Sequence, residues 1–272
     1  MLHEMAARTR AQFTSGVDLV EVYATVSDSR GAPLSGLTRD DFIVEEDGKR
    51  QEIRTFSAGQ FPLALAVGID RSFSMAKVGL PAISRSVRGF LSALRPDDQA
   101  MLVGIGSQTE VLAPLSRDRR PALEALDHLD PWGTTPLYDA TLSAVESIEP
   151  ASGRRALILI SDGADRYSQT TATALLDRVR RKDVLIYPIA VGKTRDAVFV
   201  EMATVTGGRS FQVANASSLA GALTTIADEL RFQYLIGYVP APRGGRPGWR
   251  SIQVRVNRPD ARVRARDGYV AP

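Results

Sequence analysis

The stretch LALAVGIDRSFS, residues 63–74, decides the character of the whole chain. Its first part, residues 63–69, is an uninterrupted apolar run, which is typical of a strand buried on both faces of a sheet. Asp70, Ser72 and Ser74 follow directly, at the expected carboxyl end of that strand. Open α/β sheets bind ligands in the crevice beyond such strand ends. The stretch therefore predicts an α/β core and a polar site at its edge.

After residue 74, apolar strand-like runs alternate with segments of 3.6-residue periodicity. Alternation of this kind requires crossover connections, so we predict a doubly wound, Rossmann-like α/β fold with a mostly parallel central sheet and helices on both faces. Further strands are predicted at residues 99–105, 109–115, 155–160 and 184–191. Helices are predicted at residues 83–94, 119–129, 137–148, 172–181, 196–206 and 215–230, the last capped by Asn215.

Both ends of the chain show a β-type pattern instead. Residues 17–26 and 251–256 alternate apolar and polar side chains, as in half-buried strands. Residues 41–56 form two strand-like arms around Asp47-Gly48, a pair that accepts the positive φ angles of a tight hairpin. The ends of the chain are therefore predicted to be rich in β-strands.

We predict that residues 61–231 form an α/β domain inserted into a discontinuous β-sandwich, which is built from residues 17–58 and 233–272. Insertion is plausible because the ends of a domain often lie close together. Residues 1–16 are expected to be a disordered or extended N-terminus. The alternative is two separate small β caps, each of which would bury little of its own surface.

The composition excludes several classes of site. The 272 residues are 44% hydrophobic and 24% charged, as in an ordinary folded protein. The absence of cysteine excludes disulfides, thiolate metal sites and a cysteine nucleophile. His3 and His128 are too few for a multi-histidine metal site, and His128 fits a solvated helix position. No apolar run approaches the about 20 residues that span a bilayer, so we predict no transmembrane segment.

The net charge of +3 is unevenly distributed. From residue 231 onward, nine arginines face only Asp260 and Asp267, which gives +7 for this part and leaves −4 for residues 1–230. The arginines are typical of a solvated face of strands and loops, and binding of an anionic polymer is the alternative. No aromatic-rich signature of nucleic-acid binding accompanies them.

Two further loops are expected at the same edge as Asp70. Asp162 follows the predicted strand 155–160, and Thr135 precedes Pro136 at the start of a predicted helix. Carboxylate and hydroxyl oxygens are the hard donors that Mg²⁺ prefers. The three loops therefore predict a site for a divalent cation.

Together, these loops resemble the von Willebrand factor type A (VWA) domain family. DRSFS at 70–74 is similar to the D-x-S-x-S motif that begins the family's metal-ion-dependent adhesion site (MIDAS). GTTPLYDA at 133–140 resembles its threonine loop, and LISDG at 159–163 its aspartate loop. The resemblance covers about residues 61–230. Three flanking segments also resemble a bacterial von Willebrand-related family in which the A domain lies between β segments: residues 36–56, 234–240 and 263–270.

The resemblance implies a Mg²⁺ or Mn²⁺ ion held by five residues: Asp70, Ser72, Ser74, Thr135 and Asp162. The two serines and the threonine would be direct or nearly direct ligands, and the two aspartates would bind directly or through water. The family often has two glycines before its threonine. Here Thr134 occupies the second glycine position, so Thr134 is the alternative ligand to Thr135, which we favour because it precedes the proline.

The resemblance also implies that an Asp or Glu of a protein partner fills an open coordination position. Two carboxylates roughly neutralise a divalent ion and hydroxyl ligands donate little charge, so the metal stays electrophilic. We therefore expect a divalent-metal-dependent adhesion or interaction module without enzymatic activity and without a small-molecule substrate. Five loop residues are expected at the rim, with packing as the alternative for the first two: Phe73, Trp132, Arg71, Arg166 and Tyr167.

Two other functions stay open. The first is a magnesium-dependent hydrolase, although the three motifs contain no histidine, no lysine and no G-x-x-x-x-G-K-[ST] phosphate loop. The second is binding of an anionic polymer or a nucleic acid through the arginine-rich C-terminal β segment. Binding of that kind would depend steeply on salt.

The location of the protein is predicted mainly from the resemblance. Residues 1–13 lack the apolar stretch of about 7–15 residues that a secretory signal requires. The protein is therefore either cytoplasmic or has lost a signal. The resemblance favours an exported protein, periplasmic or extracellular.

Overall fold

Six strands form the central sheet of the protein. The computed structural model describes residues 19–59, 61–192, 197–241 and 247–271. The sheet has the order β10-β9-β8-β5-β6-β7, and only β6 and β7 are antiparallel neighbours. Its strands are β5 (Leu63–Asp70), β6 (Gln99–Ile105), β7 (Thr109–Ser116), β8 (Arg154–Ser161), β9 (Leu185–Val191) and β10 (Phe211–Val213).

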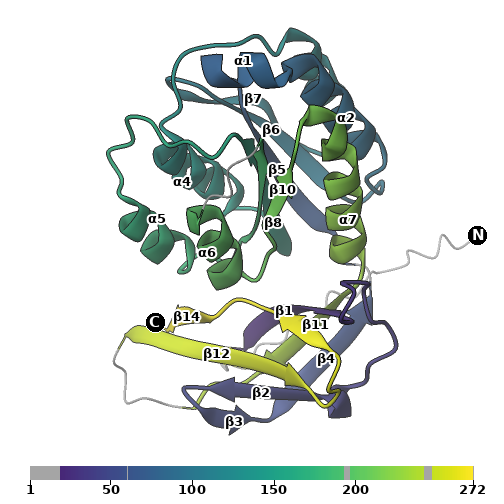
Figure 1. Cartoon of the computed structure of the whole chain (residues 1–272). Coiled ribbons are helices and arrows are strands. Elements are labelled where there is room, and N and C mark those ends of the chain that lie inside the picture. Colours follow the sequence, from purple (N-terminus) through teal and green to yellow (C-terminus); the bar gives the residue numbers. More distant parts are fainter. Residues whose placement is uncertain (1–18, 60, 193–196, 242–246, 272) are drawn as a thin grey trace, which may run out of the picture.

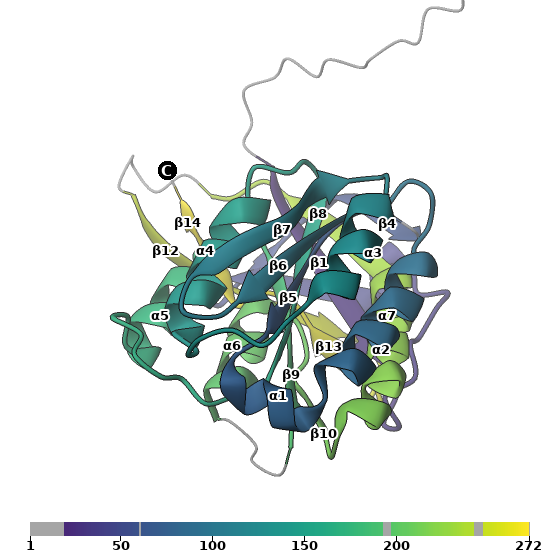
Figure 2. The same cartoon turned by 90° about the horizontal axis from the view of Figure 1, so that it is seen from above.

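Helices cover both faces of this sheet (Figure 1 and, from above, Figure 2), as the alternating pattern predicts. Helices α2, α3 and α7 pack on one face and α4, α5 and α6 on the other. Every residue of β5 is buried, because this central strand meets a helical layer on each side. The helices are α1 (Phe73–Val78), α2 (Leu80–Ser92), α3 (Arg120–Ala125), α4 (Leu137–Ile148), α5 (Ala172–Val179), α6 (Ala197–Thr206) and α7 (Leu219–Arg231).

No helix within the described ranges combines the length and the apolar character needed to cross a membrane. The predicted doubly wound α/β fold with a mostly parallel sheet is confirmed.

The remaining strands form two four-stranded antiparallel sheets that pack against each other below the central sheet in Figure 1. Their orders are β13-β1-β11-β4 and β14-β12-β2-β3. Val22 and Ile236 from one sheet and Val44 and Ile252 from the other share one buried core. The strands are β1 (Val20–Ser27), β2 (Phe42–Glu46), β3 (Lys49–Gln51), β4 (Ile53–Gly59), β11 (Gln233–Tyr238), β12 (Gly248–Val256), β13 (Arg262–Arg264) and β14 (Gly268–Ala271).

The two ends of the chain therefore meet in the β-sandwich that was predicted from them. β1 pairs directly with β11, which lies about two hundred residues later in the chain. The predicted disordered or extended stretch, residues 1–16, lies outside the described residues.

The predicted hairpin around Asp47-Gly48 forms, but its second arm is divided. Asp47 and Gly48 have φ angles of 49° and 75°, and they join β2 to β3 in a two-residue turn. After the exposed Glu52 the chain moves to the other sheet, where β4 pairs with β11. The change of sheet places Phe56 against Phe42, with ring centroids 5.4 Å apart. The sandwich core is closed by this contact.

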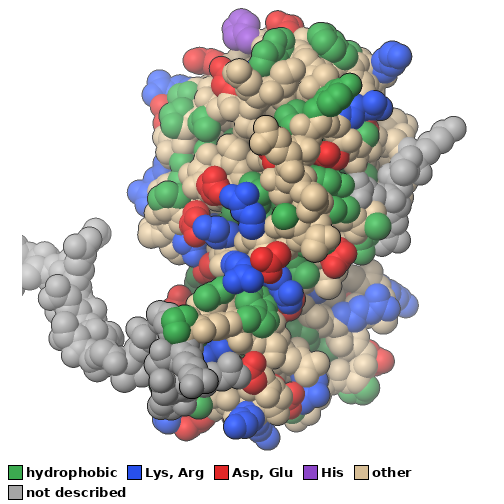
Figure 3. Space-filling model, turned by 90° about the vertical axis from the view of Figure 1, so that its left-hand side faces the viewer, with side chains coloured by type: hydrophobic (Ala, Val, Ile, Leu, Met, Phe, Trp, Pro, Cys, Tyr) green, Lys and Arg blue, Asp and Glu red, His purple; other side chains and the backbone are tan. Residues whose placement is uncertain are grey.

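Buried polar contacts join the sandwich to the α/β part. The carboxylate of Glu229 on α7 is 1% exposed, and it forms ion pairs of 2.7 Å with Arg209, which follows α6, and with Arg264 on β13. On the α5 side, Arg180 pairs with Asp267 at 2.6 Å and stacks over Trp249 at 4.4 Å. Figure 3 shows acidic and basic side chains gathered along this side of the molecule.

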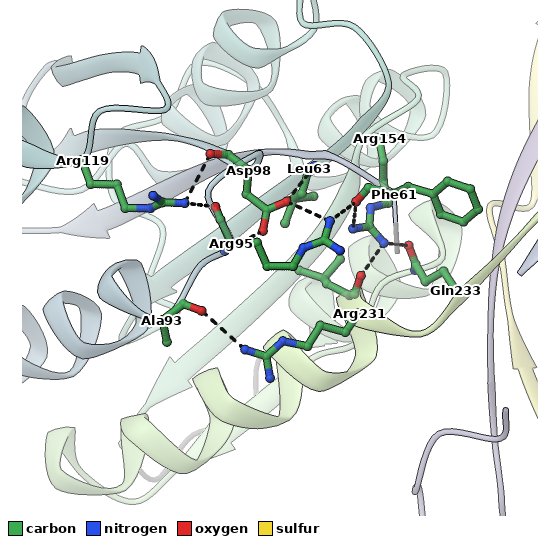
Figure 4. A network of polar contacts seen from close by, with 10 residues as sticks. Phe61, Leu63, Ala93, Arg95, Asp98, Arg119, Arg154, Arg231 and Gln233 are labelled. Atoms are coloured by element: carbon green, nitrogen blue, oxygen red, sulfur yellow. Dashed lines mark hydrogen bonds and ion pairs between the residues drawn. The ribbon is translucent and has the colours of Figure 1, made fainter. Parts of the chain in front are cut away.

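A second set of contacts surrounds Arg154, at the start of β8 (Figure 4). Its guanidinium donates hydrogen bonds to the carbonyl of Phe61 at 2.9 Å, to Oε1 of Gln233 at 2.9 Å and to the carbonyl of Leu230. The carbonyl of Leu230 lies at the C-terminus of α7, where a nearby positive charge is favourable. Burial lowers the pKa of Arg154 to about 10, so the group stays charged at neutral pH. Gln233 in turn donates to Oγ1 of Thr25 on β1 at 2.8 Å. Helix α7 is therefore fixed to both parts of the molecule.

We predict that Glu229→Ala lowers the free energy of unfolding by about 2–3 kcal/mol, because it leaves two arginines at the junction without their shared carboxylate. The loss stays below that of a fully buried pair since both arginines reach solvent. Urea denaturation of the wild type and the variant measures this change in the free energy of unfolding. Glu149→Ala is the control: it breaks a more exposed pair with Lys182 and costs less than about 1 kcal/mol. Equal losses for the two variants would contradict this role for Glu229.

Candidate metal centre

Asp70 lies at the carboxyl end of β5, on the side of the sheet that faces away from the sandwich (Figure 1). Its side chain is fully buried, with 0% of the residue exposed. Oδ1 accepts a hydrogen bond from the backbone amide of Ser72 at 2.9 Å and faces Oγ1 of Thr135 at 3.4 Å. Oδ2 accepts one from the hydroxyl of Ser161, at the end of neighbouring β8, at 2.7 Å. Three loops therefore converge on a single carboxylate.

The charge of this carboxylate is poorly compensated by the protein. Burial raises the pKa of Asp70 above its ordinary value, and the nearby charge of Asp162 raises it further, against the lowering effect of hydrogen bonds from Ser161 and Ser72. Within the described part of the chain, neither Asp70 nor Asp162 has a lysine or arginine in ion-pair contact. Two neighbouring carboxylates without a basic partner form an environment that favours a bound cation.

Hydroxyl groups surround the same point. Oγ of Ser72 lies 3.0 Å from Oγ of Ser74, and Ser72 is buried while Ser74 is half-buried. Thr135 is 1% exposed and faces Asp70, whereas Thr134 is exposed. The backbone amide of Thr134 donates to Oγ of Ser107 at 3.1 Å. The geometry therefore favours Thr135 over Thr134 as a ligand.

The donor set fits a hard divalent cation. It offers two carboxylates and three hydroxyls, and no nitrogen or sulfur. No group of three or more His, Cys, Asp or Glu side chains suited to a metal is found among the described residues, so a metal here depends on the hydroxyls. Oxygen-only donor sets of this kind suit Mg²⁺ or Mn²⁺.

The first two loops are tied together by their backbones. The amide of Phe73 donates to the carbonyl of Gly133 at 3.1 Å, and the amide of Trp132 donates to the carbonyl of Arg71 at 2.6 Å. Gly133 has a φ of +73°, and a Cβ at this position would lie 2.2 Å from Oγ of Ser107. Only glycine fits this close approach, which places the threonine loop against Ser107 in the turn between β6 and β7.

The third loop is fixed to the second. The amide of Arg166 donates to the carbonyl of Thr135 at 2.7 Å. Asp165 accepts hydrogen bonds from the amide of Tyr138 at 3.1 Å and from the hydroxyl of Ser168 at 2.6 Å. The aspartate loop is therefore fastened to the start of α4.

Two of the residues expected at the rim pack against the protein. The side chain of Arg71 is 13% exposed, forms an ion pair with Glu110 on β7 at 2.8 Å and stacks against Trp132 at 5.3 Å. Trp132 is 40% exposed and lies so close to Gly106 that a Cβ there would be 2.6 Å from its ring. Both side chains stabilise the loop, and only the outer part of Trp132 faces solvent.

The other three rim candidates are exposed. Phe73 is 64% and Tyr167 80% exposed, and Arg166 is also exposed. Tyr167 has a φ of +71°, a left-handed conformation that a bulky residue rarely adopts and that costs about 1–3 kcal/mol. The hydrogen bonds on either side of Tyr167 hold the backbone in this conformation.

Sequence reasoning missed two supporting residues, Ser161 and Ser107. Ser161 could have been found from the pairing of β5 with β8, since Ile69 opposite Ile160 places the next residues, Asp70 and Ser161, side by side. Ser107 lies in the turn between β6 and β7, and no local pattern links it to the threonine loop.

Comparisons with known proteins place this geometry in a family. The sequence profile of the von Willebrand factor type A domain matches residues 65–226, which is more than half of the chain. A search of curated proteins gives no significant match.

Solved structures share the fold at low sequence identity. A von Willebrand factor type A protein from Catenulispora acidiphila is 14% identical with a TM-score of 0.56, covering 92% of this chain and 73% of that one. An aerotolerance-related membrane protein from Bacteroides fragilis is 18% identical, with a TM-score of 0.52 and coverages of 62% and 100%. Proximal thread matrix protein 1 from the mussel byssus, with zinc in its MIDAS motif, is 16% identical, with a TM-score of 0.54 and coverages of 68% and 49%.

The fold, the order of the three loops and the profile match agree, and the chain belongs to the von Willebrand factor type A domain family.

Proposed function

We propose that the protein is a divalent-metal-dependent protein-binding module. In this proposal Asp70, Ser72, Ser74, Thr135 and Asp162 hold Mg²⁺ or Mn²⁺. The bound ion supplies an electrophilic coordination position, and a partner's Asp or Glu carboxylate fills it. The observation that carries the proposal is the fully buried carboxylate of Asp70, which has no basic partner in the described part of the chain.

Two further observations support a metal at this place. The hydroxyls of Ser72, Ser74 and Thr135 are gathered beside the carboxylate without any histidine. The mussel byssus protein, which shares the fold, holds zinc in its MIDAS motif. Zinc therefore belongs in the test beside magnesium and manganese.

A binding role is favoured over an enzymatic one. The three loops contain no histidine or lysine to transfer a proton or to stabilise a transferring phosphoryl group. The partner's carboxylate is bound as a ligand and no bond of it is broken.

The structure weakens the basis of the anionic-polymer alternative. Four arginines of the C-terminal segment are in ion pairs with acidic side chains of the protein itself: Arg250, Arg255, Arg264 and Arg266. These acidic partners reduce the net positive charge that the segment offers to a polyanion.

We also propose an exported location, periplasmic or extracellular. The related fold in a Bacteroides fragilis protein described as a membrane protein supports it. Fractionation of the native cells, with detection by antibody, tests it.

Metal binding is the first prediction of this proposal. Isothermal titration of metal-stripped protein with Mg²⁺, Mn²⁺ or Zn²⁺ is expected to give one saturable site in the wild type and none in Asp70→Asn or Asp162→Ala. A metal at one hundred times its dissociation constant should stabilise the wild type by about 2.7 kcal/mol. The metal-free Asp70→Asn variant should be at least as stable as the metal-free wild type, because it removes a buried and poorly compensated charge.

Asp127→Asn is a matched control, since Asp127 is an exposed carboxylate in an ion pair with Arg88 and is not a candidate ligand. It should bind metal like the wild type. The proposal fails if the wild type takes up none of the three ions, or if Asp70→Asn binds them equally well.

Ser161→Ala tests the residue that orients Asp70. Loss of the hydroxyl that donates to Oδ2 should weaken metal binding by about 10-fold or more, as for other residues that orient metal ligands. Calorimetry of the variant measures the change. Ser147→Ala, on the exposed face of α4, should leave the affinity unchanged. Unchanged metal affinity in Ser161→Ala would exclude this orienting role.

A further inference from the structure

The two most exposed large hydrophobic side chains of the described residues, Tyr167 and Phe73, both lie beside the Asp70 site. Phe73 directly follows Ser72, and Tyr167 directly follows Arg166, whose amide is bonded to the carbonyl of Thr135. The two rings therefore belong to two different loops that border the same buried carboxylate. Exposed aromatic side chains beside a polar site are enriched in protein–protein interfaces.

We propose that Phe73 and Tyr167 form an aromatic rim that determines the specificity of the metal centre. The rim selects a protein segment in which the metal-bound Asp or Glu is flanked by apolar side chains. This inference rests on the proposed function and adds the chemistry of the partner around its carboxylate.

Packing within the protein does not account for these rings. Within the described residues, neither Phe73 nor Tyr167 has a ring contact, and neither belongs to a hydrophobic core cluster. Trp132, on a neighbouring loop, differs from these two residues because its ring packs on Gly106 and stacks with Arg71. Of the three aromatic residues, Trp132 supports the loop and the other two are left to contact a partner.

The backbone conformation of Tyr167 also supports a role in binding. Asp47 and Tyr167 are the non-glycine residues with positive φ among the described residues. Asp47 lies in a hairpin turn, where a short polar side chain tolerates this conformation well. Tyr167 combines the strained conformation with 80% exposure, and its hydroxyl has no hydrogen-bond partner among the described residues. The strained backbone of Tyr167 therefore leaves the ring exposed to solvent and adds no packing contact.

Charge at the rim favours an acidic partner. Arg166 is exposed beside Thr135 and has no ion-pair partner in the described ranges. Its guanidinium can bind a second carboxylate or reinforce the first. The candidate ligands Asp70 and Thr135 are 0% and 1% exposed, so they lie below the rim. A carboxylate on a flexible side chain can extend below the level of the rim, whereas the flat surface of a bilayer stays at that level.

The rim is also preorganised. Backbone hydrogen bonds join the loop of Phe73 to Gly133 and the loop of Tyr167 to Thr135. A partner therefore meets loops that are already ordered, which reduces the entropic cost of binding. In protein interfaces, a few rigid aromatic side chains often contribute most of the binding energy.

Two fluorescein-labelled nonapeptides test the proposal on the full chain with saturating Mg²⁺. One has a central Glu flanked by Gly and Ser, and the other has Phe and Leu at the flanking positions. Fluorescence anisotropy should show that the wild type binds the second peptide at least about tenfold more tightly. In Tyr167→Gly and in Phe73→Ser this preference should fall below about threefold, while calorimetry gives an unchanged affinity for Mg²⁺.

Folding controls accompany these variants. Tyr167→Gly should melt at or above the temperature of the wild type, because glycine accepts the positive φ without strain. Val270→Ser removes another exposed apolar side chain, on β14 of the sandwich, and should keep the full preference for the apolar peptide.

Each contrary result has its own meaning. Equal affinity for the two peptides in a wild type that binds Mg²⁺ overturns the aromatic rim and leaves the metal centre standing. Absence of Mg²⁺ binding overturns the proposed function and the rim together. Peptide binding that persists in EDTA or in Asp70→Asn overturns the rim as part of the metal centre. Cosedimentation with phosphatidylserine vesicles that is lost in Tyr167→Gly, without any preference between the peptides, assigns the rim to a lipid surface instead.

Discussion

The pairing of β5 with β6 on one side and with β8 on the other is the constraint on which the rest of the structure depends. Parallel strands end at the same edge of a sheet, so this pairing brings Asp70 and Ser161 side by side at the end of two buried strands. The Asp70 carboxylate is 0% exposed and has no contact with bulk water. The surroundings of Asp70 must therefore supply hydrogen bonds or bind a counterion. They supply hydrogen bonds, and we propose that the three loops also bind a cation.

The opposite edge of the same sheet carries a different kind of polar structure. There, Arg154 and Glu229 are buried with partners of opposite charge or with carbonyl groups, and their contacts join helix α7, the central sheet and the sandwich. Glu229 pairs with two arginines, and the Arg154 guanidinium donates hydrogen bonds to two carbonyl groups and to Gln233. Asp70 and Asp162 accept hydrogen bonds but have no basic partner among the described residues. This difference between the two edges supports the proposal that a cation binds at the edge of Asp70.

Much of this arrangement could be predicted from the sequence, because the signals were local. The apolar run of residues 63–69 and the alternation after it gave the α/β fold, and Asp70 at the end of that run gave the place of the site. Long-range contacts were not predictable in this way. Arg71 was expected at the rim, yet it pairs with Glu110, thirty-nine residues later, and the division of the hairpin arm at Glu52 depends on pairing with β11. The choice between Thr134 and Thr135 likewise needed the burial that only the packed loops define.

In the proposed function, the candidate ligands and the aromatic rim serve different physical purposes, which would account for their large difference in exposure. A cation bound by oxygen ligands gains most where water is excluded, so Asp70 and Thr135 are buried. A bond between the metal and a carboxylate alone would discriminate little between partner proteins, because any exposed Asp or Glu presents the same group. Discrimination must come from side chains that contact the surroundings of that group, and such side chains have to be exposed before the partner arrives. Phe73 and Tyr167 meet this requirement at the cost of exposed apolar surface and, at Tyr167, of backbone strain. The fold bears that cost because the hydrogen bonds between the loops do not depend on either ring.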